Sequence, residues 1–199
     1  MERFAPFVAV DHGALPRFLH ALSRVPHELR RHEPARHARH LASLWGVRLG
    51  EAGRATLFYA DGGAVLVVVP ADRKVSTPRL RALLDVDDLR VLRGDRGVGR
   101  VGWAGLGETA GALPALPALY GAGALVDPLA LAPSRLVITL EPSRSVAIAP
   151  SDFVALVGAR VARVAGSTQL LEAGGMVDDL SSEGERSGWA GEDSNLRRR

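Results

Sequence analysis

Two short apolar runs joined by a glycine turn are the clearest pattern in the chain. Residues 55–59 and 64–69 are rich in branched and aromatic side chains, and Asp61-Gly62-Gly63 lies between them. Such runs on either side of a glycine turn are typical of a β-hairpin. Because the second run has no polar position, it predicts a strand that is buried on both faces. We therefore place the hairpin at the centre of a sheet.

The rest of the pattern mixes helices and strands without strict alternation. Helices are predicted at residues 15–22, 35–45, 78–84 and 151–156, the third capped by Ser76 or Thr77 and the last with Ser151 or Asp152 near its cap. Strands are predicted as a short one ending at His32 and at residues 123–126, 135–140, 146–149 and 159–164. This order indicates an α/β fold with a mixed, largely antiparallel central sheet flanked by helices.

Length and composition predict one domain with additional segments at its ends. The chain has 199 residues, 47% of them hydrophobic, which is enough for one sizeable core. We place the domain at residues 15–165, after an N-terminal extension at 1–14. Residues 166–199 are rich in Gly, Ser and acidic side chains and poor in branched apolar ones, so we predict a disordered tail there.

The absence of cysteine narrows the possible chemistry. Without it the chain has no thiolate nucleophile, no disulfide and no Cys-ligated zinc. The first residues have no apolar leader, and no run approaches the roughly 20 apolar residues that span a bilayer. We therefore expect a cytoplasmic protein whose catalysis, if any, uses other groups.

Positive charge is concentrated in the predicted domain. The net charge is +3, and residues 166–199 carry seven acidic residues against four arginines, which leaves +6 for the remainder. The densest basic cluster combines Arg30, Arg31, Arg36 and Arg39 with His32, His37 and His40. Such a cluster favours contact with RNA phosphates. The alternative is compositional, because arginine supplies nearly all the basic residues, as in a genome of high G+C content.

Three other kinds of site have weaker support. Gly97-Val-Gly99-Arg-Val-Gly102 matches a dinucleotide-binding string, but further glycines follow it where a helix should begin, which favours a loop. This loop, from Gly94 to Gly111, could border a ligand pocket. The histidines lack the second cluster that completes a zinc site, and no serine stands in a Gly-x-Ser-x-Gly elbow.

The order of the motifs, from about Leu15 to Val164, resembles the YbaK-like aminoacyl-tRNA editing domain, a family related to the insertion domain of prolyl-tRNA synthetase. The parts that carry the resemblance are the strand before Pro70, the Gly111-Ala-Leu-Pro114 loop, the strand that ends at Asp127, and Asp152-Phe153 opening the last helix. No single motif decides it; the ordered series does.

The resemblance implies a fold, an activity and a site. Family members hydrolyse the ester between a wrong amino acid and the tRNA ribose, relying on positioning and electrostatic stabilisation rather than a protein nucleophile. It implies substrate contacts from Gly111, Pro114 and Asp127, although Asp127 could equally be a turn or cap residue. Arg54 stands where the family has lysine, and we expect it to anchor the aminoacyl or adenosine end. Arg30, Arg31, Arg36 and Arg39 become candidate tRNA contacts.

Alternatives remain at this point. The Arg54 substitution and the stiff Pro142, in a loop that is usually glycine-rich, would suit a relative that binds tRNA or an amino-acid-like ligand without turnover. A free-standing binding module for a small ligand is a third possibility. For the enzyme we expect no cofactor and no metal, aminoacyl-tRNA as the partner, and contact with a prolyl-tRNA synthetase as a further possibility.

Overall fold

A computed structural model of the protein describes residues 11–92 and 112–168. The α-helices are α1 (Ala14–Leu22), α2 (Ala38–Trp45), α3 (Thr77–Leu84) and α4 (Pro150–Val157). Short 3-10 helices are η1 (Leu49–Glu51), η4 (Pro117–Tyr120) and η5 (Pro128–Leu131). The strands are β1 (His27–Arg31), β2 (Gly53–Ala60), β3 (Gly63–Pro70), β4 (Arg73–Val75), β5 (Leu89–Val91), β6 (Gly123–Val126), β7 (Leu136–Glu141), β8 (Arg144–Ile148), β9 (Arg160–Val161) and β10 (Ala165–Thr168).

The strands form two main sheets and one short ribbon. The five-stranded sheet has the order β5-β2-β3-β6-β9, the three-stranded sheet has the order β1-β8-β7, and β10 pairs with β4. Only β3 with β6 and β6 with β9 run parallel, and the other pairs are antiparallel. The predicted α/β class with a mixed, largely antiparallel sheet is confirmed.

The β2–β3 hairpin lies where the sequence predicts it. β3 is the central strand of the five, and every one of its residues is buried. Asp61 and Gly62 form the turn with φ values of 42° and 93°. Positive φ at both central positions is what a tight hairpin turn requires, because it matches the twist of the strands.

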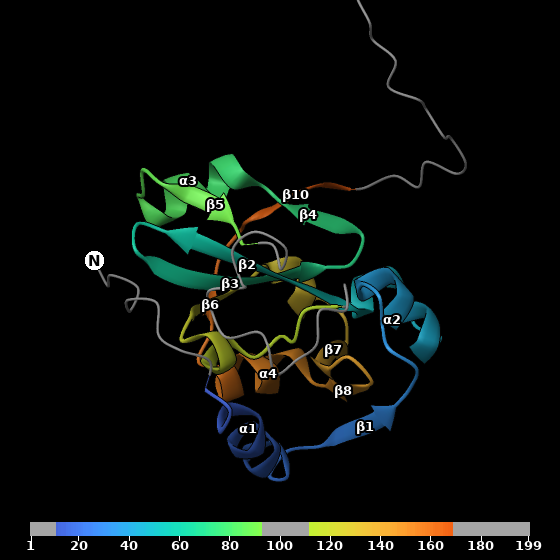
Figure 1. The fold of residues 1–199 in the computed structure, drawn as a ribbon. Coiled ribbons are helices and arrows are strands. Elements are labelled where there is room, and N and C mark those ends of the chain that lie inside the picture. Colours follow the sequence, from blue (N-terminus) through green and yellow to red (C-terminus); the bar gives the residue numbers. More distant parts are fainter. Residues whose placement is uncertain (1–10, 93–111, 169–199) are drawn as a thin grey trace, which may run out of the picture.

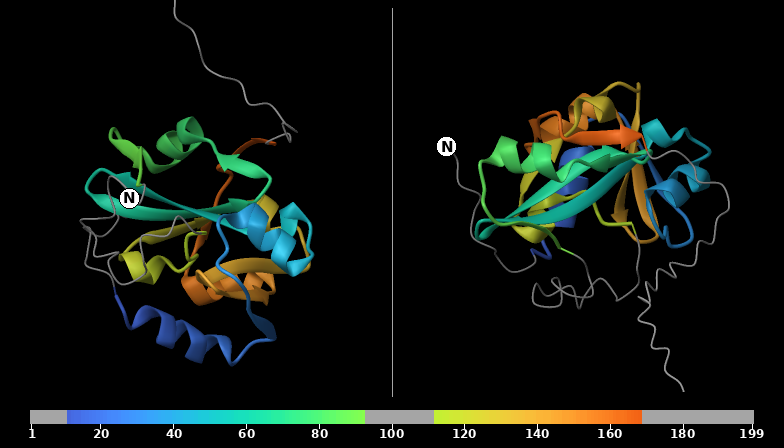
Figure 2. Two further views of the ribbon diagram at one scale, coloured as in Figure 1. Left: turned by 45° about the vertical axis from the view of Figure 1, so that its right-hand side comes forward. Right: turned by 90° about the horizontal axis from the view of Figure 1, so that it is seen from above.

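Two hydrophobic clusters cover the two faces of the five-stranded sheet. Leu66 and Val68 of β3 pack with Phe18 of α1, Phe153 of α4 and the inner residues of β7 and β8. Val65, Val67 and Val69 pack with Leu80 of α3 and with Val164. Figure 1 shows the same layers, with α1 and α4 on one side of β2 and β3 and α3 with the β4–β10 ribbon on the other. Figure 2 shows α2 apart from both, near the ends of β2 and β7.

The two sheets meet where β2 begins. Ala52 forms a parallel bridge with Val137 of β7. The next residue is Gly53, where an added Cβ would lie 3.1 Å from Ile138 Cγ2 and 3.2 Å from Val68 Cγ1. An added methyl group would press on both neighbours, so the absence of a side chain at Gly53 favours the close approach of β2 to β7.

Three of the predicted element boundaries differ from those in the structure. The second helix begins at Ala38 rather than residue 35, because His37 is extended and its Nδ1 accepts the His40 N–H as an N-cap. The last helix begins at Pro150 with Ala149 at its N-cap and no side-chain cap bond, so neither Ser151 nor Asp152 caps it.

The third difference concerns the predicted strand at residues 159–164. Only Arg160–Val161 belongs to a strand there, and the chain then crosses to β4 and forms β10. The cause is the Asp127 carboxylate, which accepts the backbone N–H groups of Val164 and Ala165. The described part of the chain continues through β10 to residue 168. None of the helices in the described part of the chain is long and apolar enough to cross a membrane.

We predict that Gly53→Ala destabilises the protein by about 1–3 kcal/mol, because the new methyl group overpacks the contact with Ile138 and Val68. Gly50→Ala is the matched control, since an added Cβ there meets nothing within 4 Å. Urea unfolding of both variants measures the difference. Equal stability of the two variants would contradict a tight junction.

Candidate active site

Arg54 is a half-buried charged residue at the place where the two sheets meet. It is the second residue of β2, and its Nη2 donates to the carbonyl oxygen of Ala71 at 3.1 Å. Burial lowers the pKa of Arg54, the nearby positive charge of Arg39 lowers it further, and the carboxylate of Asp72 acts in the opposite direction. A half-buried cation of this kind is a favourable partner for an anionic or polarised oxygen.

The N-terminal turn of α2 forms one wall beside Arg54. Ala38 and Ala42 of α2 pack on Ala52 and Ala71, so the helix is held against the open end of the β2–β3 hairpin. His37 caps the helix, and burial and the nearby cations, first His40 and then Arg36 and Arg54, lower the pKa of His37. In neutral His37, Nδ1 accepts the His40 N–H, so Nε2 carries the proton.

A row of polar residues crosses the three-stranded sheet on the face that α2 covers. Arg30 lies opposite Ser145, and Ser145 lies opposite Thr139. The guanidinium of Arg30 lies over the Trp45 ring, 4.2 Å from its centroid. Ala52 and Val137 form an isolated parallel bridge, and Arg54 and Thr139 each lie two residues beyond it on their own strand. The row therefore extends toward Arg54.

Ser145 is the centre of a complete hydrogen-bond chain. Trp45 Nε1 donates to Ser145 Oγ at 2.6 Å, and Ser145 Oγ lies 2.8 Å from His32 Nε2. His32 Nδ1 lies 2.6 Å from the Glu33 carbonyl oxygen, which can only accept, so Nδ1 carries the proton. Ser145 therefore donates to Nε2, and its hydroxyl both donates and accepts.

The loop that contains Pro114 is fixed against the same face. The Ala112 N–H donates to the Ala35 carbonyl at 2.7 Å, and the Ala115 N–H donates to the Thr139 carbonyl at 2.9 Å. Tyr120 donates its hydroxyl to the Pro114 carbonyl at 3.1 Å, and burial raises the pKa of Tyr120, which keeps this donor protonated. Gly111 and the glycine-rich stretch before it lie outside the described residues.

Two buried polar atoms in the described part of the chain have no hydrogen-bond partner: Asp72 Oδ1 and Thr139 Oγ1. Asp72 is close enough to Arg54 to affect its charge, and Thr139 lies two residues beyond the bridge that joins β7 to the start of β2. An unpaired buried polar atom costs stability unless something binds it. Because these two atoms and the half-buried Arg54 all lie near the start of β2, we take this place as the candidate site.

The structure brings some of the predicted site residues together and separates others. Arg54 and Arg39 lie close together, and Pro114 belongs to the loop on the Thr139 face. Arg30 faces the same side but is paired with Glu28 at 2.7 Å. Arg31 points to the other face of β1, and Arg36 is exposed before α2.

The Asp127 carboxylate accepts hydrogen bonds from the backbone of three other residues. One carboxylate oxygen accepts the Leu129 N–H at 2.9 Å, and the other accepts the Val164 and Ala165 N–H groups, each at 2.7 Å. The side chain is 2% exposed. These contacts correspond to the turn and cap role that the sequence left open beside substrate binding.

Sequence reasoning missed Asp72 and Thr139. Asp72 follows Pro70 at the end of the central strand, and the sequence indicates a strand terminus there but not a site residue. Thr139 stands inside an apolar strand, where a single threonine gives no signal. Its position becomes visible only through the register of β7 with β8.

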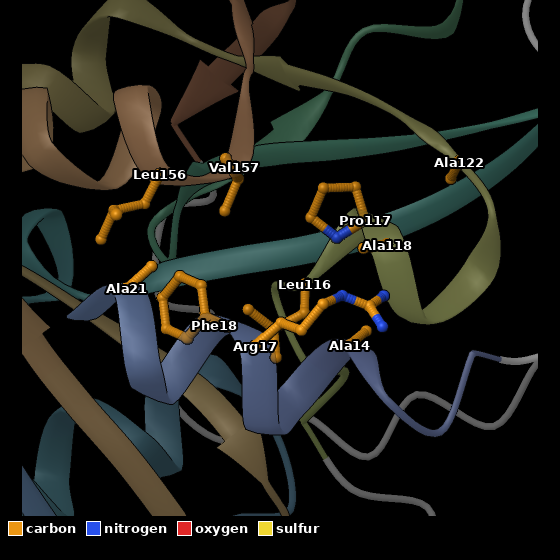
Figure 3. Close-up of a pocket in the computed structure, with 10 residues that line it drawn as sticks. All are labelled: Ala14, Arg17, Phe18, Ala21, Leu116, Pro117, Ala118, Ala122, Leu156 and Val157. Atoms are coloured by element: carbon orange, nitrogen blue, oxygen red, sulfur yellow. The ribbon is translucent and has the colours of Figure 1, made fainter. Parts of the chain in front are cut away.

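A separate pocket of about 380 Å³ lies between α1, η4 and α4 (Figure 3). Phe18 and Ala21 of α1 face Leu156 and Val157 of α4 across it, and Leu116 and Pro117 line it from the η4 side. Its charged lining residue is Arg17, which pairs with Asp11. The rest of its lining is apolar, so this pocket suits an apolar group. The described residues also hold no group of three or more His, Asp or Glu suited to a metal ion.

Comparison with known proteins decides the family. The sequence profile of the aminoacyl-tRNA editing domain matches residues 32–156, which is more than half of the chain. The chain belongs to the aminoacyl-tRNA editing domain family. The matched range includes Arg54, Asp72, the 111–114 loop and Thr139, so the residues of the candidate site all lie within the editing domain.

Solved structures show the same fold. One, described as a "putative trans-editing enzyme for prolyl tRNA synthetase", matches with a TM-score of 0.60 and 19% identity, covering 77% of this chain and 98% of that one. Another, described only as a hypothetical protein, matches with a TM-score of 0.63 and 20% identity, covering 75% and 99%. The search of curated proteins returned no match. At these identities the structures establish the fold of the editing domain.

We predict that Asp127→Asn destabilises the fold by about 2–3 kcal/mol, because an amide N–H₂ would face two backbone N–H donors in place of a charged acceptor. Thermal or urea unfolding measures this loss. Loss of activity at unchanged stability would instead assign Asp127 to the substrate.

Proposed function

We propose that the protein is a trans-acting aminoacyl-tRNA deacylase that clears mischarged tRNA. The family match supports the reaction class, and the half-buried Arg54 supports the position of the site. In the reaction, water attacks the ester carbonyl carbon, either directly or after a substrate hydroxyl has first taken over the acyl group in a new ester. The bond from the carbonyl carbon to the ester oxygen breaks, a proton passes to that oxygen, and the products of the attack by water are free amino acid and intact tRNA.

Arg54 has the properties that this reaction needs. Negative charge develops on the carbonyl oxygen of a tetrahedral intermediate, and a fixed cation in a partly dry site stabilises it. The guanidinium is oriented by its bond to the Ala71 carbonyl, and α2 restricts water from one side. In this proposal Arg54 anchors the aminoacyl end, while the loop of Gly111 and Pro114 lines the pocket.

The proposed chemistry needs no protein nucleophile. The chain has no cysteine, and Ser145 is fully buried with its hydroxyl engaged by Trp45 and His32. Positioning of substrate groups is therefore the main contribution left to the protein.

We predict that Arg54→Ala lowers kcat/KM for hydrolysis of mischarged tRNA by about 100-fold, the loss typical of removing one stabilising group from an oxyanion site. Arg54→Lys should retain or raise the rate, because it restores the charge in the form that the family uses. Arg81→Ala is the matched control, because it removes one exposed arginine from α3.

The measurement is release of amino acid from alanyl-, cysteinyl- and seryl-tRNA specific for proline. Turnover that Arg54→Ala abolishes and Arg81→Ala leaves intact supports the proposal. Binding of tRNA with no release from any member of the panel would contradict it and indicate a non-catalytic relative.

We propose that the arginines around the N-terminus of α2 contact the tRNA backbone. Arg31 and Arg36 are exposed, and no carboxylate among the described residues lies within ion-pair distance of either. Arg30 and Arg39 lie closer to the site, so they would contact the acceptor end. A cytoplasmic location and a prolyl-tRNA synthetase partner would accompany this function and remain part of the proposal.

We predict that replacing Arg31 and Arg36 together by alanine weakens tRNA binding and lowers the slope of log Kd against log salt by about 1–2, because each phosphate contact contributes about 0.7–0.9 to that slope. Filter binding over a salt series measures it. The double variant Arg81→Ala with Arg163→Ala removes equal charge elsewhere and should behave as wild type. Identical slopes for both double variants would place the tRNA on another surface.

A further inference from the structure

Thr139 carries a hydroxyl that the folded chain does not use. The residue is 2% exposed, and its Oγ1 has no hydrogen-bond partner among residues 11–92 and 112–168. Ser145 lies opposite Thr139 on β8, and its hydroxyl is hydrogen-bonded to both Trp45 and His32. Two hydroxyls lie side by side on one sheet face, and only one of them has a role within the protein.

The surroundings of Thr139 show what could approach it. Its own carbonyl accepts the Ala115 N–H, so the 112–115 loop lies alongside. Arg54 lies two residues beyond the Ala52–Val137 bridge on β2, as Thr139 does on β7. A substrate whose ester oxygen lies at Arg54 would place its amino-acid side chain within a few atoms of Arg54, in the direction of the polar row.

A free hydroxyl beside a cation selects its ligand. A cationic group is disfavoured there by the positive charge of Arg54, and an apolar group would leave Oγ1 unpaired. A short neutral group that can donate or accept a hydrogen bond satisfies both conditions. A pocket that contains such a polar atom discriminates strongly against an analogue that lacks the partner group.

We propose that Thr139 determines specificity and hydrogen-bonds the side chain of the amino acid to be removed, so that the preferred substrates carry a small hydroxyl-type side chain rather than a methyl group. This inference rests on the deacylase function proposed above. Serine and alanine differ by one hydroxyl, which makes seryl and alanyl esters on the same tRNA the natural pair of probes.

The test compares three proteins on both esters. Wild type should hydrolyse the seryl ester with a kcat/KM about tenfold above that of the alanyl ester, the factor that one hydrogen bond supplies. Thr139→Val, which keeps the shape and removes the hydroxyl, should bring the ratio of the seryl rate to the alanyl rate down to about one. Thr56→Val, the same change on β2, should keep the wild-type ratio.

Thermal stability provides an independent readout. Removing an unpaired buried hydroxyl should leave Tm unchanged or raise it, so the loss of discrimination cannot be attributed to unfolding. A Thr139→Val variant with a markedly lower Tm would show that the hydroxyl is structural and would overturn the proposal. Equal wild-type rates on the two esters, or an equal change in both rates, would overturn it as well.

Failure of the enzyme proposal can be told apart from failure of this one. If wild type hydrolyses neither ester, the deacylase function fails, and the subsite is then tested by calorimetric binding of amide-linked seryl- and alanyl-adenosine. A preference for the seryl compound that Thr139→Val removes would support the subsite. Equal affinities would overturn it.

Discussion

The close approach of β2 to β7 at Gly53 is the constraint on which the rest of the structure depends. The parallel bridge from Ala52 to Val137 joins the two sheets, and Gly53 permits it because a side chain there would collide with Ile138 and Val68. The face opposite this contact carries Ala52, Arg54 and the β7 residues under α2. One backbone contact therefore completes the core on one side and assembles the candidate site on the other.

The two sides of this contact differ in how their side chains contribute to stability. The core side is apolar and closely packed, from Leu66 and Val68 to the inner residues of β7 and β8. The site side holds a half-buried guanidinium and two unpaired polar atoms, an arrangement that lowers stability. Buried polar groups without partners concentrate where function requires them, since a ligand can supply the missing bonds. The nearby Trp45–Ser145–His32 chain shows that the fold satisfies polar groups on this face when they serve structure.

The sequence predicted the architecture well and the site only in part. The hairpin, the central position of β3 and the class of sheet follow from local pattern, because a fully apolar run can only be a buried strand. The start of α2 and the path after β9 could not be predicted, since they depend on the His37 cap and on the reach of Asp127 to residues distant in sequence. Arg54 was found through the family resemblance. Thr139 was missed because its significance comes from strand register and from an absent partner, neither of which a sequence displays.

The most direct measurement of the central claim is a crystal structure of the protein with an amide-linked aminoacyl-adenosine, a stable analogue of the tRNA end. The account predicts the analogue beside α2, with its carbonyl oxygen at the Arg54 guanidinium and its side chain directed at Thr139. Binding of the analogue in the apolar pocket between α1 and α4, with Arg54 and Thr139 untouched, would contradict it.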